Sequence, residues 1–161
     1  MSTTETATLA GGCFWGVEEL IRKLPGVVDT TVGYAGGTLE SPRYEDVKTG
    51  RTGHAESVEI VFNPKEISYD DILDFFFRLH DPTTPNRQGN DVSTQYRSAI
   101  FVHDEKQREA AKKAIERAQE RWPRPITTEI VDHTQFWAAE DYHQDYLQKK
   151  PHGYTCHYLR W

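Results

Sequence analysis

Apolar residues follow two kinds of spacing along this chain, and their order predicts a mixed α/β fold. Short apolar stretches predict strands at 6–10, 27–34, 57–63, 97–103 and 126–132. Apolar residues three and four positions apart predict helices at 13–24, 68–80, 106–122 and 136–150. Pro25-Gly26 and Pro151 end the first and the last of these helices.

The first six elements occur in the order β-α-β-β-α-β, which is the pattern of a ferredoxin-like split βαβ unit. A helix, a strand and a helix follow them. We therefore expect an α/β fold of the α+β two-layer sandwich type, with a ferredoxin-like core and an additional C-terminal helix, strand and helix. Residues 1–161 are expected to form a single domain, with residues 1–5 disordered and about 150–161 forming a C-terminal tail.

Two long polar segments, 35–54 and 81–94, separate predicted strands and helices. Loops of this length inside a compact domain are uncommon and often functional. We expect both segments to contribute to a site at the edge of the sheet.

Composition and charge narrow the classes of protein that fit this chain. It has 161 residues, a net charge of -6 and no basic cluster, which argues against binding to nucleic acid or an anionic membrane. No apolar run approaches the roughly 20 residues that cross a bilayer, and the polar start lacks the regions of a signal peptide. Two cysteines are too few for a secreted disulfide framework. The reducing cytoplasm is therefore the expected location. We also expect a monomer without a metal or another cofactor.

Cys13 stands where a predicted strand runs into Gly11-Gly12 and a helix begins. The glycines allow a tight turn with accessible amides, and a helix N-terminus stabilises a thiolate. The pKa of this thiol is therefore expected to lie below its free value of about 8.5. Beside a reactive sulfur, Phe14 and Trp15 would form an apolar wall for a methyl group. The alternative is a buried apolar cysteine next to two core aromatics.

Glu56 comes just before the predicted strand at 57–63, and strand parity places it on the face of Val58 and Ile60. A carboxyl at the mouth of an apolar face is desolvated, which raises its pKa and keeps it protonated near neutral pH. A protonated carboxyl is suited to general acid catalysis. The alternative is a glutamate that reaches solvent from the end of the strand. Spacing alone does not decide between the two.

Six segments of the chain carry a family resemblance. They are GGCFWG (11–16), GYAGG (33–37), YEDVKTGRTGHAE (44–56), HDPTTPNRQGND (80–91), QYRSAIF (95–101) and AEDYHQDYL (139–147). Together they closely resemble the sequence of the peptide methionine sulfoxide reductase A family. The resemblance keeps the same order and covers nearly the whole chain from about residue 8.

This resemblance implies an enzyme that reduces methionine S-sulfoxide, free and in proteins, and so repairs oxidative damage. Cys13 matches the family's nucleophile, and Glu56 matches the acid that protonates the sulfoxide oxygen. The matching substrate-binding residues are Phe14 and Trp15 around the methyl group, Tyr44 and Tyr96 at the oxygen, and the polar Asp91.

The implied reaction leaves Cys13 as a sulfenic acid, which condenses readily with a second thiol. The resemblance implies that Cys156, the other cysteine of the chain, resolves this sulfenic acid. A thioredoxin-like partner would then reduce the Cys13–Cys156 disulfide. The chain departs from the commoner family pattern at Ser93, where glycine is usual, at Lys48, where some members have a further cysteine, and in its single tail cysteine.

Two other classes of protein would use some of the same residues. A Cys-His hydrolase would pair Cys13 with a histidine base, for which His54 is the obvious candidate. A metal-binding module would use His152, Cys156 and His157, although their spacing matches no closed zinc motif.

Overall fold

The computed structural model describes residues 4–88, 91–153, 155 and 157–160 and has a mixed α/β fold. Its six-stranded sheet has the order β7-β6-β1-β3-β2-β8. Neighbouring strands are antiparallel except β6 and β7, which are parallel. The strands are β1 (Glu5–Gly11), β2 (Val27–Ala35), β3 (Ala55–Phe62), β6 (Ser98–Val102), β7 (Glu129–Asp132) and β8 (Phe136–Ala138). A separate short ribbon joins β4 (Arg87–Gln88) to β5 (Asp91–Val92).

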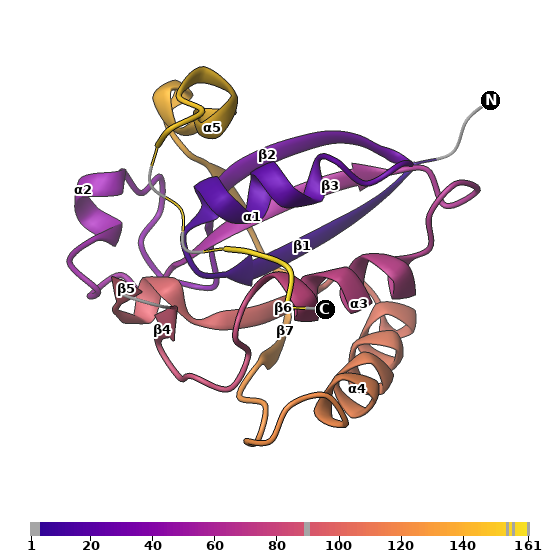
Figure 1. Ribbon diagram of the computed structural model, residues 1–161. Coiled ribbons are helices and arrows are strands. Elements are labelled where there is room, and N and C mark those ends of the chain that lie inside the picture. Colours follow the sequence, from indigo (N-terminus) through magenta and orange to yellow (C-terminus); the bar gives the residue numbers. More distant parts are fainter. Residues whose placement is uncertain (1–3, 89–90, 154, 156, 161) are drawn as a thin grey trace.

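Figure 1 shows the sheet curled behind three longer helices. These are α1 (Phe14–Ile21), α3 (Tyr69–Leu79) and α4 (Glu105–Gln119). Shorter helical turns are α2 (Tyr44–Val47), η1 (Thr94–Tyr96), η2 (Asp141–His143) and α5 (Tyr146–Lys149). The main core lies between the sheet and the long helices, where apolar residues such as Leu9, Phe62 and Phe76 are fully buried. This packing holds the start of α1 against the end of β1.

The predicted strands and the first three predicted helices are all present, with ends that differ by a few residues. Local capping explains two of the helix starts. The side chain of Ser68 accepts the amide of Asp71 at the start of α3, and Asp104 accepts the amide of Gln107 at the start of α4. Strand β1 begins at Glu5, inside the stretch that we expect to be disordered, because Glu5 pairs with Phe62 of β3.

The predicted helix at 136–150 is wrong. Residues 136–138 form β8 on the open edge of β2, where Gly33 lies opposite Ala138. Gly33 permits this approach, since a Cβ atom there would clash with the carbonyl oxygen of Trp137. Asp145 then has a φ of 56°, which interrupts helical geometry before α5. The helical spacing is real, but the strand edge supplies backbone hydrogen bonds that the sequence pattern does not reveal.

Gly33→Ala is expected to lower the free energy of unfolding by roughly 1–3 kcal/mol, because the added methyl group overpacks the β2–β8 contact. Urea unfolding of the purified variant measures this change. Val28→Ala is the matched control, since Val28 lies on the same strand with 62% of its surface exposed. Equal stability of Gly33→Ala and wild type would mean that β8 is not held against β2.

The two long loops carry structure of their own. The loop before β3 contains α2, and the loop before β6 contains β4, β5 and η1. Both loops lie at the same end of the molecule (Figure 1). Within the described residues, no helix is both long and apolar enough to cross a membrane.

Candidate active site

The structure brings seven of the eight predicted site residues to one cavity of about 170 Å³. It is lined by Cys13, Phe14, Trp15, Tyr44, Glu56, Asp91 and Tyr96. Cys13 is the N-cap of α1, Phe14 and Trp15 are the first two residues of α1, Glu56 comes from β3, and the others come from the two long loops. The expectation that both loops contribute to a site therefore agrees with the structure.

Cys13 occupies the N-cap position of α1 and is 7% exposed. Gly12, with a φ of 100°, turns the chain from β1 into this helix. A side chain at Gly12 would also meet neighbours, because a Cβ atom there would lie 2.6 Å from Cγ of Gln88. The sulfur is therefore held at the positive end of the α1 dipole, where a negative charge is stabilised.

Glu56 is buried, with 2% of its surface exposed, so it does not reach out to solvent. Its Oε1 accepts the backbone amide of Phe14 at 3.3 Å, and its Oε2 accepts the side-chain amide of Gln95 at 2.5 Å. Burial raises the pKa of this carboxyl from 4.5 to about 8. The two hydrogen bonds oppose this rise, and the charge of Asp91 adds to it. Near neutral pH the carboxyl is mostly protonated and can donate a proton.

Tyr44 and Tyr96 place two phenol groups in the same cavity. Burial raises the pKa of Tyr44 to about 12, with further contributions from Glu56 and Cys13, whereas a hydrogen bond with Tyr96 opposes the rise. Burial also raises the pKa of Tyr96 above its ordinary value, and the charge of Glu56 raises it further. Both phenols therefore keep their hydrogens near neutral pH and remain hydrogen-bond donors.

Phe14 and Trp15 are the two aromatic residues of the cavity that carry no hydroxyl group. Phe14 is fully buried against the ring of Tyr34, with ring centroids 5.8 Å apart. The Trp15 ring stacks on Tyr146 with centroids 3.8 Å apart, and its Nε1 donates to Nδ1 of His143 at 3.0 Å. The indole is therefore fixed by residues of the C-terminal segment, which the site prediction did not include.

Sequence reasoning also missed two supports of the polar groups. Gln95 donates to Glu56, as described above, and Glu140 accepts the backbone amide of Tyr44 at 2.9 Å. The hydroxyl of Tyr34 donates to the other oxygen of Glu140 at 2.9 Å. Gln95, Glu140 and Tyr34 all lie in segments that carry the family resemblance. That resemblance was the signal from which their roles could have been predicted.

His54, the candidate base of a Cys-His hydrolase, makes hydrogen bonds away from Cys13. Nδ1 of His54 accepts the amide of Gly37 at 3.1 Å, and Nε2 lies 2.7 Å from the carbonyl oxygen of Leu39. Both ring nitrogens therefore hold the loop before α2, and neither is available as a base for Cys13. Among the described residues, no group of three His, Cys, Asp or Glu side chains could hold a metal ion.

The structure accounts for two of the departures from the family pattern, Ser93 and Lys48. Ser93 has a φ of 177°, which is extended backbone that any residue adopts, so glycine is not required there. Lys48 pairs with Glu45 at 2.8 Å on the surface of α2. The eighth predicted site residue, Cys156, lies outside the described residues.

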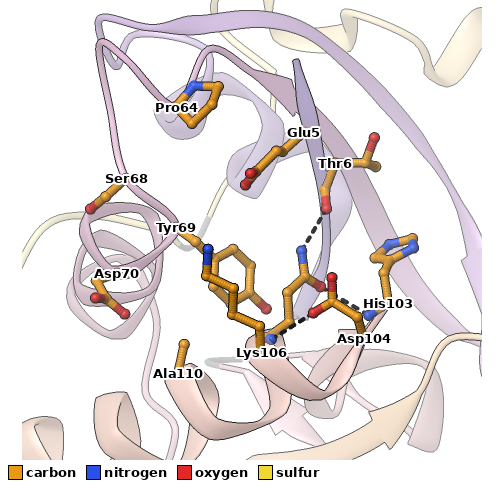
Figure 2. Close-up of a pocket in the computed structure, with 11 residues that line it drawn as sticks. Glu5, Thr6, Pro64, Ser68, Tyr69, Asp70, His103, Asp104, Lys106 and Ala110 are labelled. Atoms are coloured by element: carbon orange, nitrogen blue, oxygen red, sulfur yellow. Dashed lines mark hydrogen bonds between the residues drawn. The ribbon is translucent and has the colours of Figure 1, made fainter. Parts of the chain in front are cut away.

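A larger hollow, of about 420 Å³, lies between β1 and the first turns of α3 and α4 (Figure 2). Its polar groups are used to join α4 to the sheet. Gln107 donates to the carbonyl of Thr6 and accepts the amide of His103, both at 2.9 Å, while Asp104 caps α4. The residues that line this hollow include no cysteine, and it holds no counterpart to the Cys13–Glu56 pair.

A thiol at the start of a helix, in the same cavity as a protonated carboxyl, is typical of a thiol-dependent enzyme that supplies a proton to its substrate. Comparison with known proteins identifies the family. The family model described as peptide methionine sulfoxide reductase matches residues 5–160. The chain therefore belongs to the peptide methionine sulfoxide reductase family.

Individual relatives agree with this assignment. The peptide methionine sulfoxide reductase MsrA of Nocardia farcinica is 52% identical over 162 residues, covering 99% of this chain and 93% of the relative. The crystal structure of reduced Mxr1 from Saccharomyces cerevisiae has a TM-score of 0.94 at 43% identity, covering 98% of this chain and 93% of Mxr1. The structure of Mxr1 in complex with Trx2 has a TM-score of 0.68 at 34% identity, with 98% and 91% covered.

Proposed function

We propose that this chain reduces methionine S-sulfoxide, free and in proteins, to methionine, and so repairs oxidative damage. The observation that carries this proposal is that Cys13 and a protonated Glu56 line the same small cavity. Membership of the peptide methionine sulfoxide reductase family supports the choice of substrate.

In the proposed reaction, the Cys13 thiolate attacks the sulfur of the sulfoxide. Glu56 donates a proton to the sulfoxide oxygen, which develops negative charge as its bond to the substrate sulfur weakens. The phenols of Tyr44 and Tyr96 donate hydrogen bonds to the same oxygen, and Asp91 contributes to substrate binding. Phe14 and Trp15 surround the methyl group. The oxygen is transferred to Cys13 as a sulfenic acid, and methionine leaves.

Glu56→Gln is expected to lower the rate of methionine formation about 10²- to 10⁴-fold at pH 7, because glutamine keeps the shape of the side chain but has no titratable proton. In the wild type, the Glu56-dependent rate should fall as pH rises through about 8, where the buried carboxyl loses its proton. The deficit of the variant should shrink at low pH, where solvent supplies protons. Single-turnover rates of both proteins from pH 5 to 10 measure this.

Glu66→Gln is the matched control for this substitution, since Glu66 is an exposed glutamate outside the cavity. It should leave both the rate and the pH profile unchanged. A Glu56→Gln rate within about twofold of wild type at pH 7 would instead assign the proton transfer to Tyr44 and Tyr96.

We further propose that Cys156 resolves the sulfenic acid and that thioredoxin reduces the resulting Cys13–Cys156 disulfide. Cys156 is the only thiol of the chain besides Cys13. The structure of Mxr1 with Trx2 supports a thioredoxin as the partner. A thiol cycle of this kind requires a reducing compartment, which supports a cytoplasmic location.

We also propose that the chain is a single catalytic domain built on a ferredoxin-like core. The consecutive order β6-β1-β3-β2, with all neighbours antiparallel, supports this description of the central strands.

A further inference from the structure

The residue that follows Cys156 in the tail is anchored at the base of the active site. His157 is 7% exposed, and its Nε2 lies 2.7 Å from the carbonyl oxygen of Gly11. Because a carbonyl oxygen only accepts hydrogen bonds, Nε2 carries the hydrogen. Burial lowers the pKa of His157 to about 4, and the charge of Arg160 lowers it further, so the ring is neutral near pH 7.

Glycines of the active-site turn make room for this imidazole. A Cβ atom at Gly12 would lie 3.1 Å from Nε2 of His157. A Cβ atom at Gly16, on the first turns of α1, would clash with Nδ1 of His157 and with Oγ1 of Thr155. The sequence therefore keeps small residues on both sides of Cys13 where the tail crosses α1.

The other described residues of the tail are more exposed than His157. A hollow of about 420 Å³ separates α1 from the tail and is lined by residues that include Leu20, Leu147, Pro151 and Thr155. Among the described residues from 151 to 159, His157 is the buried one. Figure 1 shows the tail, in yellow, crossing beside α1 on its way to α3. Among the described residues, the imidazole of His157 thus links this stretch of tail to the active-site turn.

The hydrogen bond between His157 and Gly11, which we call the anchor, lies close in sequence to both cysteines. Gly11 and Cys13 are two positions apart, with Gly12 between them, so their Cα atoms are at most about 7 Å apart. A disulfide needs Cα atoms roughly 4.4–6.8 Å apart. An anchor on Gly11 therefore ties the residue that follows Cys156 in the sequence to the turn that carries Cys13, and a tether of this kind raises the effective concentration of the second thiol.

We propose that His157 is a positioning residue that holds the tail against the active-site turn and so accelerates formation of the Cys13–Cys156 disulfide. This inference rests on the resolving role of Cys156 given in the proposed function. In the step concerned, the Cys156 thiolate attacks the Cys13 sulfur, the S–S bond forms, and the S–O bond of the sulfenic acid breaks. The oxygen leaves as hydroxide and takes up a proton to become water.

The test compares His157→Ala, His157→Gln and His152→Ala, where His152 is an exposed histidine of the same tail. Each reduced protein is mixed with one equivalent of methionine S-sulfoxide, quenched at set times and alkylated. Released methionine reports the first step, and mass spectrometry of the Cys13–Cys156 peptide reports the second. His157→Ala should slow the second step about tenfold or more and leave the first unchanged. His157→Gln, which keeps a side-chain N–H donor, should restore part of the rate, and His152→Ala should match the wild type.

Gly16→Ala provides a second variant that displaces the anchor without changing His157, and it should slow the same step while methionine release persists. Disulfide formation at the wild-type rate in both His157→Ala and Gly16→Ala would overturn the anchoring role. A wild type that forms no Cys13–Cys156 disulfide at all would overturn the resolving role of Cys156 and the anchoring role with it. The two failures are therefore distinguishable by the behaviour of the wild type.

Discussion

Cys13→Ser is expected to abolish the reduction of methionine S-sulfoxide to methionine. The serine hydroxyl is almost fully protonated near neutral pH and is not oxidised to a species like a sulfenic acid, so the oxygen has no acceptor. The fold should be retained, because the substitution changes one atom at the N-cap of α1, where serine is a favoured residue. Chromatography of products formed from each sulfoxide epimer, with dithiothreitol as reductant, measures the loss.

The same substitution at the other cysteine is the matched control. Cys156→Ser should keep a substantial part of the dithiothreitol-dependent turnover that Cys13→Ser loses, because dithiothreitol reaches the sulfenic acid directly. The R epimer should not be consumed by any of the three proteins. Clear residual turnover by Cys13→Ser, or equal use of both epimers by the wild type, would contradict the assignment.

The sequence predicts the central sheet well because its strands are marked by both apolar pattern and neighbouring turns. In β3, Val58, Ile60 and Phe62 alternate and are all fully buried, and the same parity places Glu56 inside. The start of α1 is equally well marked by Gly12 and Cys13. These positions depend on local backbone geometry, which is what a sequence pattern encodes.

The C-terminal third is predicted less well, because its structure depends on contacts between distant residues. Residues 136–147 have helical spacing, yet their backbone and side chains are used by β2, α1 and the active-site loop. Gln144 bonds both the amide and the carbonyl of Val32, across 112 positions of sequence. His143 holds Trp15, and Glu140 holds Tyr44. The spacing of neighbouring residues in the sequence does not predict contacts of this kind.

The site shows the same division between local and distant determinants. The neighbours of Cys13 and Glu56 in sequence mark both as candidates, and the family resemblance supplies the roles that we propose for them. The raised pKa of Glu56 depends on burial in the assembled protein, and its orientation depends on Gln95, which is 39 positions away. The sequence therefore indicates the candidate groups, whereas the fold sets the protonation of Glu56 and the geometry of the cavity.

Cys156→Ser is expected to separate the chemical step from recycling. The variant still has Cys13 and Glu56, so one equivalent of methionine should appear in a single turnover, and the sulfenic acid at Cys13 should be trapped by dimedone. Turnover with thioredoxin should collapse, because thioredoxin attacks a disulfide and this variant cannot form one.

Mass spectrometry of the wild type after one equivalent of substrate decides whether the tail cysteine has this role. If Cys156 resolves the sulfenic acid, the protein loses two hydrogens and yields a Cys13–Cys156 peptide. If Cys156 has no part in the cycle, Cys13 instead carries a stable gain of one oxygen, and thioredoxin-dependent turnover is the same in the wild type and Cys156→Ser. The first result would make the chain a two-cysteine enzyme, in which Cys13 reacts with the substrate and the single tail thiol resolves the sulfenic acid.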